Sequence, residues 1–206
     1  MLEKAKQVTA TNGYNNLEYV RWADDLVILI DGYNKHARLI DIVMKRLKEE
    51  FAKLELEMSQ EKTKQIDLSQ ARAKLEYIGF VFRLTKRDGK SLVIRHPKRK
   101  SLINLQRSIK KIFWRKRGRA VREAVALINP KIRGWVNYFR HGNSSRHFKI
   151  LKDWYEKKVR RHLLKQKQQR GFGWKRWSRK VLYQRYGLYN DYKIIYSVLP
   201  KVKPAQ

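Results

Sequence analysis

Two adjacent carboxylates, Asp24 and Asp25, are the residues of this chain best suited to chemistry. They separate two short runs, within residues 18–30, that are rich in the Val, Ile, Leu and Tyr typical of β-strands. This pattern predicts a tight hairpin with both aspartates at or near its tip. Because a buried carboxylate without a partner is costly, we expect the pair to bind a cation, and its oxygens suit Mg²⁺ together with substrate phosphates. The alternative is a solvated turn, since Asp is common in turns.

The composition fits one ordinary domain or two small ones. Of the 206 residues, 42% are hydrophobic and 12% aromatic, which is enough for a folded core. The chain has no cysteine, which excludes disulfides and thiolate zinc sites. No stretch approaches the roughly 20 apolar residues of a membrane span, and the first residues lack the apolar core of a signal peptide. These features predict a soluble, cytoplasmic protein without a membrane partner.

Charge is distributed unevenly along the chain. Residues 1–94 carry 17 Lys/Arg and 14 Asp/Glu, whereas residues 95–206 carry 33 Lys/Arg and 4 Asp/Glu. Five of the six tryptophans also lie in the basic part. The charge excess predicts a polyanionic partner, and cations between large aromatic residues suit phosphate contact combined with base stacking. Alternatively, the tryptophans form the core.

The elements that must position the carboxylates follow from apolar periodicity. After the hairpin, apolar residues spaced three and four apart predict a helix over 35–56. We expect a short strand over 65–67 and a longer one over 75–82, which contains one glycine. Residues 87–90, Arg-Asp-Gly-Lys, are typical of a hairpin turn. This region is therefore predicted to be an α+β layer with one face of its sheet covered.

Beyond Pro97 the periodicity becomes helical. The expected helices span residues 101–117, 119–128, 131–139, 148–164 and 177–186, with a break at Asn129-Pro130 because proline disfavours a helical residue before it. The change in period and charge predicts two domains, over residues 1–96 and 97–206.

Four stretches resemble group II intron-encoded reverse transcriptases, which also act as maturases, and they occur in that family's order. They resemble the catalytic hairpin, the Lys-Thr motif that follows it, the primer-grip hairpin and the signature of the maturase-specific region. In this chain they are Arg21-Trp22-Ala23-Asp24-Asp25, Leu54-Glu55-Leu56 with Glu61-Lys62-Thr63, Tyr77-Ile78-Gly79-Phe80, and residues 129–139. Residues 171–177 are similar to bacterial members. The resemblance implies the C-terminal part of a palm over 1–96 and a helical thumb and maturase-specific domain over 97–206.

The resemblance also implies RNA-directed DNA synthesis with two Mg²⁺ ions. Asp24 and Asp25 match the metal-binding pair of the family, and Lys62 matches a lysine that approaches the triphosphate and protonates the leaving group. Gly79 matches the primer grip, where glycine would allow close approach of a primer strand. The alternatives are a surface lysine at position 62 and a simple bulge at position 79.

The resemblance gives the basic helices two roles: they grip duplex beside the palm, and they bind group II intron RNA and help it fold for splicing. Contacts of this kind recognise phosphate and RNA shape more than sequence. The candidate RNA-binding residues are Lys110, Lys111, Arg115, Lys116, Arg117, Arg119, Arg133, Lys157, Lys158, Arg160, Arg161, Lys175, Arg176, Arg179 and Lys180.

The chain departs from the family at the third carboxylate of the palm, which the family carries on a strand upstream of the hairpin. Before Asp24 the acidic residues are Glu3 and Glu18, and Trp22 stands where the family has tyrosine. Because this third carboxylate is missing, we expect the isolated chain to bind RNA but not to polymerise. We also expect a cytoplasmic bacterial protein. A separate polypeptide with the fingers and upstream palm would complete the site for an RNA/DNA primer-template.

Two other classes of function remain open. In the first, the chain is a non-catalytic, RNA-binding splicing factor or a degenerate remnant, and the palm-like region only supports the fold. In the second, it is a general basic structural protein of RNA assemblies, which would need neither the hairpin nor the Lys-Thr motif.

Overall fold

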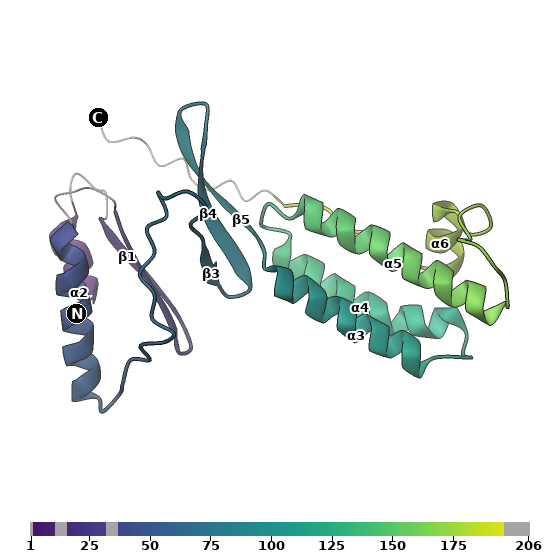
Figure 1. The fold of residues 1–206 in the computed structure, drawn as a ribbon, viewed down its shortest axis with the longest axis horizontal. Coiled ribbons are helices and arrows are strands. Elements are labelled where there is room, and N and C mark those ends of the chain that lie inside the picture. Colours follow the sequence, from purple (N-terminus) through teal and green to yellow (C-terminus); the bar gives the residue numbers. More distant parts are fainter. Residues whose placement is uncertain (1, 11–15, 32–36, 196–206) are drawn as a thin grey trace. The chain divides into compact units, whose positions relative to one another are not determined.

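The computed structural model describes residues 2–10, 16–31 and 37–195, and the chain divides into two compact units (Figure 1). Of the described residues, those up to Ala71 form the N-terminal unit and residues 72–195 form the C-terminal unit. The described residues form helices and two small antiparallel sheets, one of two strands and one of three, and the basic part is helical. The predicted α+β class is confirmed. Within these residues, no helix combines the length and apolar character needed to span a bilayer.

The N-terminal unit is a β-hairpin packed with helices. Its elements are α1 (Leu2–Thr9), β1 (Leu17–Trp22), β2 (Asp25–Ile30) and α2 (Ala37–Lys53). Leu26, Ile28 and Ile30 alternate along β2 and pack against the small core formed by Leu17 with two residues of α2. The hairpin and the helix predicted over 35–56 are confirmed, but the helix ends at Lys53, before Glu55 with its positive φ of 54°. Residues 35 and 36 lie outside the described ones.

The strand predicted over 65–67 is wrong, because this segment has no regular structure and is exposed. The side chain of Asp67 accepts hydrogen bonds from the backbone N–H of Ser69 at 2.9 Å and from its hydroxyl at 2.7 Å. These bonds satisfy the backbone locally, which competes with strand pairing. They also lower the pKa of Asp67, the hydroxyl bond contributing most.

The sheet of the C-terminal unit is an antiparallel meander of β3 (Leu75–Tyr77), β4 (Phe80–Arg87) and β5 (Lys90–Pro97). The predicted turn after Arg87 is confirmed. The single strand predicted over 75–82 is wrong, because Tyr77 pairs with Phe80 and the chain reverses between them. Ile78 and Gly79 both have positive φ, 39° and 80°, which is the conformation of the two-residue turn that matches strand twist. Gly79 is thus neither a strand residue nor a bulge.

The helices of the C-terminal unit are α3 (Arg99–Arg115), α4 (Val121–Phe139), α5 (Ser145–Gln166) and α6 (Arg179–Tyr186). The predicted break at Asn129-Pro130 is wrong, since α4 continues through Pro130. Proline within a helix costs about 3 kcal/mol. However, Val125, Ile128 and Ile132 keep one buried face on both sides of it, and their burial offsets that cost. Pro130 itself is exposed.

The three-stranded sheet packs on these helices rather than standing apart. The ring of Phe80 lies 4.8 Å from that of Phe139, measured between centroids, and the Arg95 side chain donates to the His141 carbonyl. A Cβ at Gly142 would stand 2.9 Å from the Arg95 carbonyl, so the close approach of the two segments requires glycine. The compact units therefore divide after residue 71. The predicted division of function at 96/97 stays a prediction.

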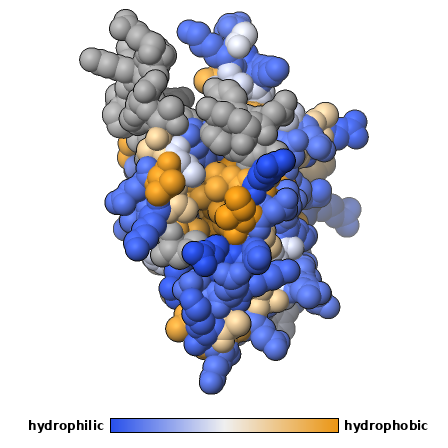
Figure 2. All heavy atoms as spheres, turned by 90° about the vertical axis from the view of Figure 1, so that its left-hand side faces the viewer, coloured by the Kyte–Doolittle hydropathy of each residue, from blue (hydrophilic) through white to orange (hydrophobic). Residues whose placement is uncertain are grey.

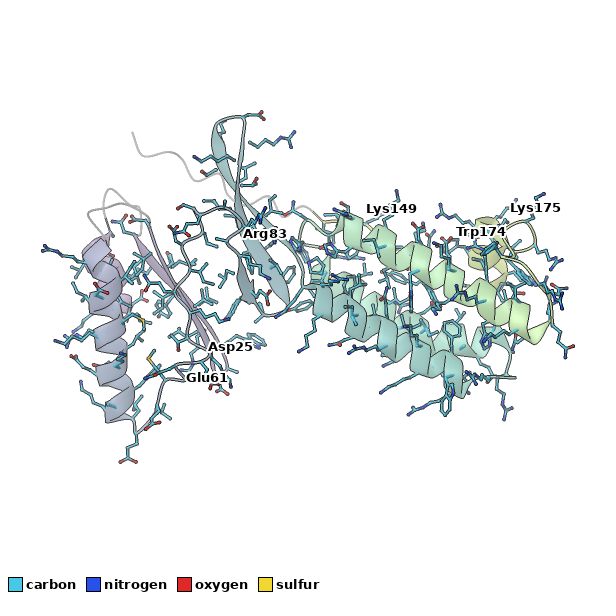
Figure 3. All side chains as sticks on the ribbon, viewed as in Figure 1. Asp25, Glu61, Arg83, Lys149, Trp174 and Lys175 are labelled. Atoms are coloured by element: carbon cyan, nitrogen blue, oxygen red, sulfur yellow. The ribbon has the colours of Figure 1, made fainter. Side chains whose placement is uncertain are left out.

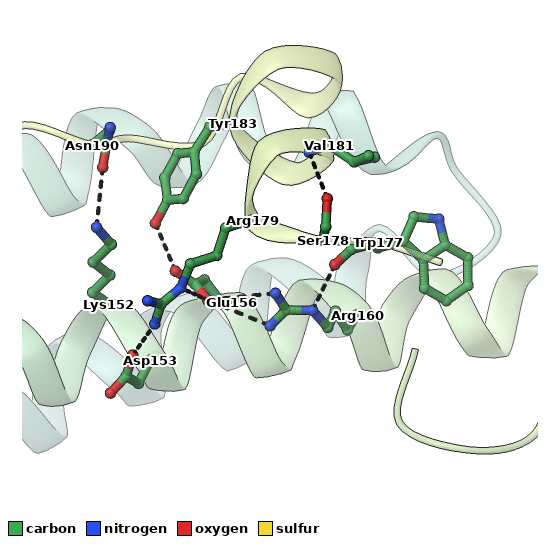
Figure 4. Close-up of polar contacts among 10 residues, drawn as sticks. All are labelled: Lys152, Asp153, Glu156, Arg160, Trp177, Ser178, Arg179, Val181, Tyr183 and Asn190. Carbon is green, nitrogen blue, oxygen red and sulfur yellow. Dashed lines mark hydrogen bonds and ion pairs between the residues drawn. The ribbon is translucent and has the colours of Figure 1, made fainter. Parts of the chain in front are cut away.

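A buried polar network fixes α6 on α5 (Figure 4). Glu156 is 1% exposed and Arg160, one turn later, is 2% exposed; their charged groups lie 3.5 Å apart. Glu156 also accepts hydrogen bonds from Arg179 at 3.1 Å and from Tyr183 at 2.8 Å. Burial and this hydrogen bond raise the pKa of Tyr183. Since a buried charge is tolerated only when it is paired, the four residues form one structural unit.

The surface also exposes apolar side chains. Figure 2 shows hydrophobic residues gathered in one area of the face it presents, within a largely hydrophilic surround. In the N-terminal unit, the exposed large hydrophobic residues of the hairpin include Val20, Trp22 and Leu29. They alternate with the residues that face the core, so the second face of this two-stranded sheet is open to solvent.

Candidate nucleic-acid interface

Asp24 and Asp25 lie where the β1–β2 hairpin turns, as predicted. Trp22 pairs with Asp25, which leaves a two-residue turn of Ala23 and Asp24. Asp25 is labelled in Figure 3. Ala23 has φ 51°, a left-handed conformation that costs a residue with a Cβ about 1–2 kcal/mol. Arg21 donates to the Ala23 carbonyl at 3.0 Å and so supports the turn. Both aspartates are exposed. A strained turn that presents two accessible carboxylates is consistent with a functional site.

These two carboxylates fit a divalent cation only in part. Mg²⁺ is often held by one or two protein carboxylates and completed by water and phosphate oxygens, which Asp24 and Asp25 would allow. Among the residues that the structure describes, no third His, Cys, Asp or Glu joins them in a group that could hold a metal. Lys62 lies apart from the hairpin in sequence, in an exposed turn held by hydrogen bonds from Thr63 to the Ser59 carbonyl.

Gly79 belongs to a turn beside an open groove of about 730 Å³. The Tyr138 hydroxyl donates to the Ile78 carbonyl at 2.7 Å, and so α4 holds the turn in place. The Trp135 indole donates to the Ser101 hydroxyl at 2.9 Å and ties α4 to α3. A Cβ at Gly79 would meet only ordinary contacts; its positive φ is what requires glycine.

The groove has an aromatic lining and a cationic rim. Trp135 and Tyr138 contribute the aromatic surface, and the lysines that line the groove are Lys98, Lys100 and Lys131. Lys98 also pairs with Glu76, whose pKa the bonds from Lys74 and Lys98 lower to about 2. No residue that lines the groove is acidic. A groove of this composition suits a nucleic-acid strand.

A second cationic site forms where α3 and α5 pack together. Burial lowers the pKa of Lys158, and the positive charges of Arg161, Lys110 and Lys165 lower it further. The Lys158 ammonium also lies 5.7 Å from the centre of the Trp154 ring. We call Lys110, Lys158, Arg161 and Lys165 the α3–α5 cluster. In the described part of the chain, none of these four is recorded in an ion pair, so the cluster concentrates charge that a polyanion would neutralise.

Most other predicted RNA-binding residues are exposed. On α3, Lys111 and Arg115 share a stripe with Arg107, and on α5 Lys157 lies one turn before Arg161. The remaining exposed members are Arg117, Arg119, Arg133, Lys175, Arg176 and Lys180. As predicted, residues 115–119 span the end of α3 and the following loop.

Three of the predicted RNA-binding residues have partners within the protein. Arg160 is buried in the Glu156 network, where burial lowers its pKa and Glu156 opposes that shift; an RNA contact does not fit that position. Arg179 joins Glu156 and Asp153, and Lys116 pairs with Glu123 at 3.3 Å. Sequence spacing along α5 could not separate Arg160 from Arg161, because only packing decides which of two neighbours faces inward.

The carboxylates of the basic part are all used internally. Glu123, Asp153 and Glu156 pair as described above, and Asp191 pairs with Arg140 at 2.8 Å. These are the 4 acidic residues of the sequence beyond residue 94, against 33 Lys/Arg. The remaining cations therefore lack enough acidic partners within this part of the chain. Binding of a polyanion would relieve their mutual repulsion.

Some of the five tryptophans in the basic part belong to the core, and others are exposed enough to stack on bases. Trp177 is buried, and Trp135 and Trp154 pack against the core. Trp114 and Trp174 are 64% and 49% exposed, which leaves them available for stacking.

The matching family model is the maturase-specific domain of group II introns, and the match covers residues 102–187. This part of the chain is similar to the maturase-specific domain. The match begins in α3 and ends just after α6, so it includes the α3–α5 cluster and the 129–139 signature. It supports a maturase role in intron splicing. A comparison with curated proteins found no match.

Sequence reasoning missed two residues of the maturase region, Lys165 and Asn129, that make contacts in the structure. Lys165 completes the α3–α5 cluster, and its spacing of four from Arg161 was the available signal. Asn129 donates to the Gly187 carbonyl at 2.8 Å and accepts from the Tyr189 N–H at 3.1 Å, which ties α4 to the end of α6. No local pattern indicates a partner 60 residues away.

Proposed function

We propose that this chain binds group II intron RNA through the cationic surfaces of α3 and α5 and thereby stabilises the fold that the intron needs for splicing. The observation that carries the proposal is the α3–α5 cluster, inside the matched maturase region. Structured RNA brings phosphates close together, and a cation cluster offsets their repulsion. Exposed cations along both helices extend the contact beyond the cluster.

The test compares two variants of the full chain that lose equal charge. The first replaces Lys110, Lys158, Arg161 and Lys165 with Gln; the control replaces Lys4, Lys45, Lys48 and Lys64, all exposed in the N-terminal unit. Affinity for a group II intron RNA is measured over a range of salt. Each lost phosphate contact reduces the slope of log K against log salt by roughly 0.7–0.9. We expect a reduced slope and reduced splicing in the first variant alone.

A second experiment tests whether the chain prefers intron RNA over other RNA. Binding of intron RNA is compared with binding of an unrelated structured RNA at the same salt. We expect tighter binding of the intron. Equal affinity for both would instead favour a general basic protein of RNA assemblies.

We propose a second function, RNA-directed DNA synthesis in a complex with a polypeptide that carries the fingers and upstream palm. The specific observation is the strained hairpin turn with two exposed aspartates. Asp24 and Asp25 would hold Mg²⁺, which when bound activates an attacking oxygen and stabilises a leaving phosphate. In that complex the Lys62 ammonium would donate a proton to the leaving pyrophosphate. The groove beside Gly79 would hold the primer strand of the primer-template.

Primer extension tests this second function. The purified chain is assayed alone and together with the fingers-and-palm polypeptide of a group II intron protein. We expect synthesis only in the mixture, and its loss in Asp24→Asn and Asp25→Asn. Synthesis by the chain alone would contradict the need for a partner. Splicing that fails in the same Asn variants, with folding intact, would show that the hairpin serves RNA binding as well.

A further inference from the structure

The segment between α5 and α6 exposes aromatic and basic residues together. Phe172 is 80% exposed and Trp174 is 49% exposed. Arg170, Lys175 and Arg176 of the same segment are exposed too, and Trp174 and Lys175 both come from this segment in Figure 3. Between Glu156 and Asp191 the sequence contains no carboxylate. We call residues 170–176 the aromatic loop.

Contacts with the buried residues Trp177 and Arg160 anchor the aromatic loop on the core. Trp177 is 6% exposed, and its ring fills the space over Gly173, where a Cβ would stand only 2.6 Å from it. Arg160 donates to the Trp177 carbonyl at 2.9 Å, and its guanidinium carbon lies 4.2 Å from the centre of the Trp174 ring. The buried Glu156 network thus holds Trp174 in one orientation.

The anchoring leaves Phe172 in solvent. Gly171 and Gly173 on either side have positive φ, 98° and 74°, a backbone conformation that glycine adopts readily. Burying a Phe side chain is worth about 1.5–3 kcal/mol relative to leaving it exposed. Because the Phe172 ring is not buried in the folded chain, this burial free energy is still available when a partner covers the ring.

The chemistry of the surroundings indicates what this partner is. Cations next to an exposed aromatic ring suit phosphates next to a base, and stacking on a side chain needs a base that is free of pairing. An anionic lipid surface would also meet cations and aromatic rings. RNA is favoured because the loop lies inside the matched maturase region and follows α5, the helix that carries three of the four residues of the α3–α5 cluster.

We propose that the aromatic loop is a stacking site for unpaired bases of the RNA, with Phe172 and the exposed half of Trp174 as the platforms and Lys175 on the adjacent phosphate. The proposal rests on the proposed RNA-binding function and adds a division of labour. The α3–α5 cluster binds the phosphates of structured RNA, and the aromatic loop binds single-stranded nucleotides.

The experiment uses the full chain, the intron RNA and two versions of one short RNA, single-stranded and fully duplexed, with 2-aminopurine in the single strand as a stacking probe. The variants are Phe172→Ala, Phe172→Tyr and Lys175→Gln. Leu127→Ala, at an apolar residue of α4 that is 49% exposed, is the matched control for lost surface. Thermal unfolding verifies that each variant folds, and we expect Phe172→Ala to melt as the wild type does because its ring is exposed.

We expect Phe172→Ala to weaken single-strand binding about tenfold and to abolish most of the 2-aminopurine quenching, with duplex binding and the salt slope unchanged. Phe172→Tyr and Leu127→Ala should bind as the wild type does. Lys175→Gln should reduce the salt slope by roughly 0.7. Wild-type single-strand binding by Phe172→Ala, or an equal loss on duplex, would overturn the stacking site.

Two further outcomes separate this proposal from the one it rests on. If the wild-type chain binds neither intron RNA nor the single strand, the proposed function itself fails. If it binds intron RNA while Phe172→Ala affects only the binding of phosphatidylserine vesicles, the loop is a lipid contact and the stacking site is overturned alone.

Discussion

The two units of this chain differ in what they contain: the N-terminal unit has the candidate catalytic residues, and the C-terminal unit has the larger hydrophobic core. The N-terminal unit carries the paired aspartates, yet among its described residues the buried apolar core consists of Leu17, Val43 and Leu47. The C-terminal unit carries no comparable catalytic motif, and its core gathers side chains from β4 and from all four helices. Buried apolar area is the main favourable term in folding. A unit can therefore carry a specific sequence motif and still have only a small buried core to stabilise it.

The difference also concerns charge. The C-terminal unit buries one carboxylate, Glu156, and pairs it with arginines, whereas both aspartates of the N-terminal hairpin are exposed. Buried charges stabilise only within a complete network, and exposed ones are available to ligands. Four changes would break or sharpen this comparison.

The largest expected effect is on the buried network of the C-terminal unit. Glu156→Ala leaves the buried Arg160 without its partner, so the free energy of unfolding should fall by about 3–5 kcal/mol. Urea unfolding measures it. Asp153→Ala, which removes the more exposed partner of Arg179, is the control and should cost about 0–1 kcal/mol. Equal losses in the two variants would contradict the structural role of Glu156.

The next effect is on the small core of the N-terminal unit. Leu17→Ala should destabilise that unit by about 2–5 kcal/mol, because Leu17 is fully buried in a core of few residues. Native-state hydrogen exchange should show lost protection in β1 and β2 and unchanged protection in α5. Val20→Ala, at a position that is 51% exposed on the same strand, is the control. Equal loss of protection in α5 would show that the two units unfold together.

A smaller effect is expected at the base of the aromatic loop. Gly173→Ala adds a Cβ 2.6 Å from the Trp177 ring at a residue with φ 74°, and should cost about 2–4 kcal/mol through crowding and strain. Gly171→Ala meets no atom within 4 Å and should cost only the strain, about 1–2 kcal/mol. Thermal unfolding distinguishes them. An equal shift in both would mean that Trp177 gives way freely.

The smallest effect is a pH dependence in the C-terminal unit. Burial lowers the pKa of His147 below 6.5, and the nearby charges of His96 and Arg146 lower it further. The unfolded chain therefore binds more protons than the folded one below about pH 6.5, so the free energy of unfolding decreases as pH falls.

His147→Gln should reduce the difference in urea midpoint between about pH 7.5 and about pH 5.5. His141→Gln, at an exposed histidine, should leave that difference unchanged. An undiminished pH dependence in His147→Gln would assign it to other groups, such as His162, whose pKa burial also lowers.

Local sequence patterns predicted the helices and strands better than the positions where they end or are broken. The hairpin around Asp24 and the helical character of the basic part were predictable, because alternation and three-to-four spacing report burial directly. The local patterns at Pro130 and Gly79 predict the wrong structure. The first lies in a helix that tertiary burial holds together, and the second belongs to a turn that Tyr138 of α4 fixes from a distance. Both outcomes depend on contacts remote in sequence.

The candidate site was predictable as a set of residue types but not as an arrangement. Residue types alone indicated a polyanion partner and a pair of cation-binding carboxylates. They could not show that Lys110 of α3 joins Lys158 of α5 or that Arg160 turns inward, because helix periodicity places residues on a face without naming what packs there.

The sequence by itself determined the charge asymmetry, the hairpin with its two aspartates and the maturase signature, since each depends on residues close together in the chain. The tertiary structure alone decided which cations lie close together, which of them pair with Glu156, and that Phe172 stays in solvent while Trp177, five residues later, is buried. The physical reason is that burial belongs to neighbours in space, and packing sets those neighbours.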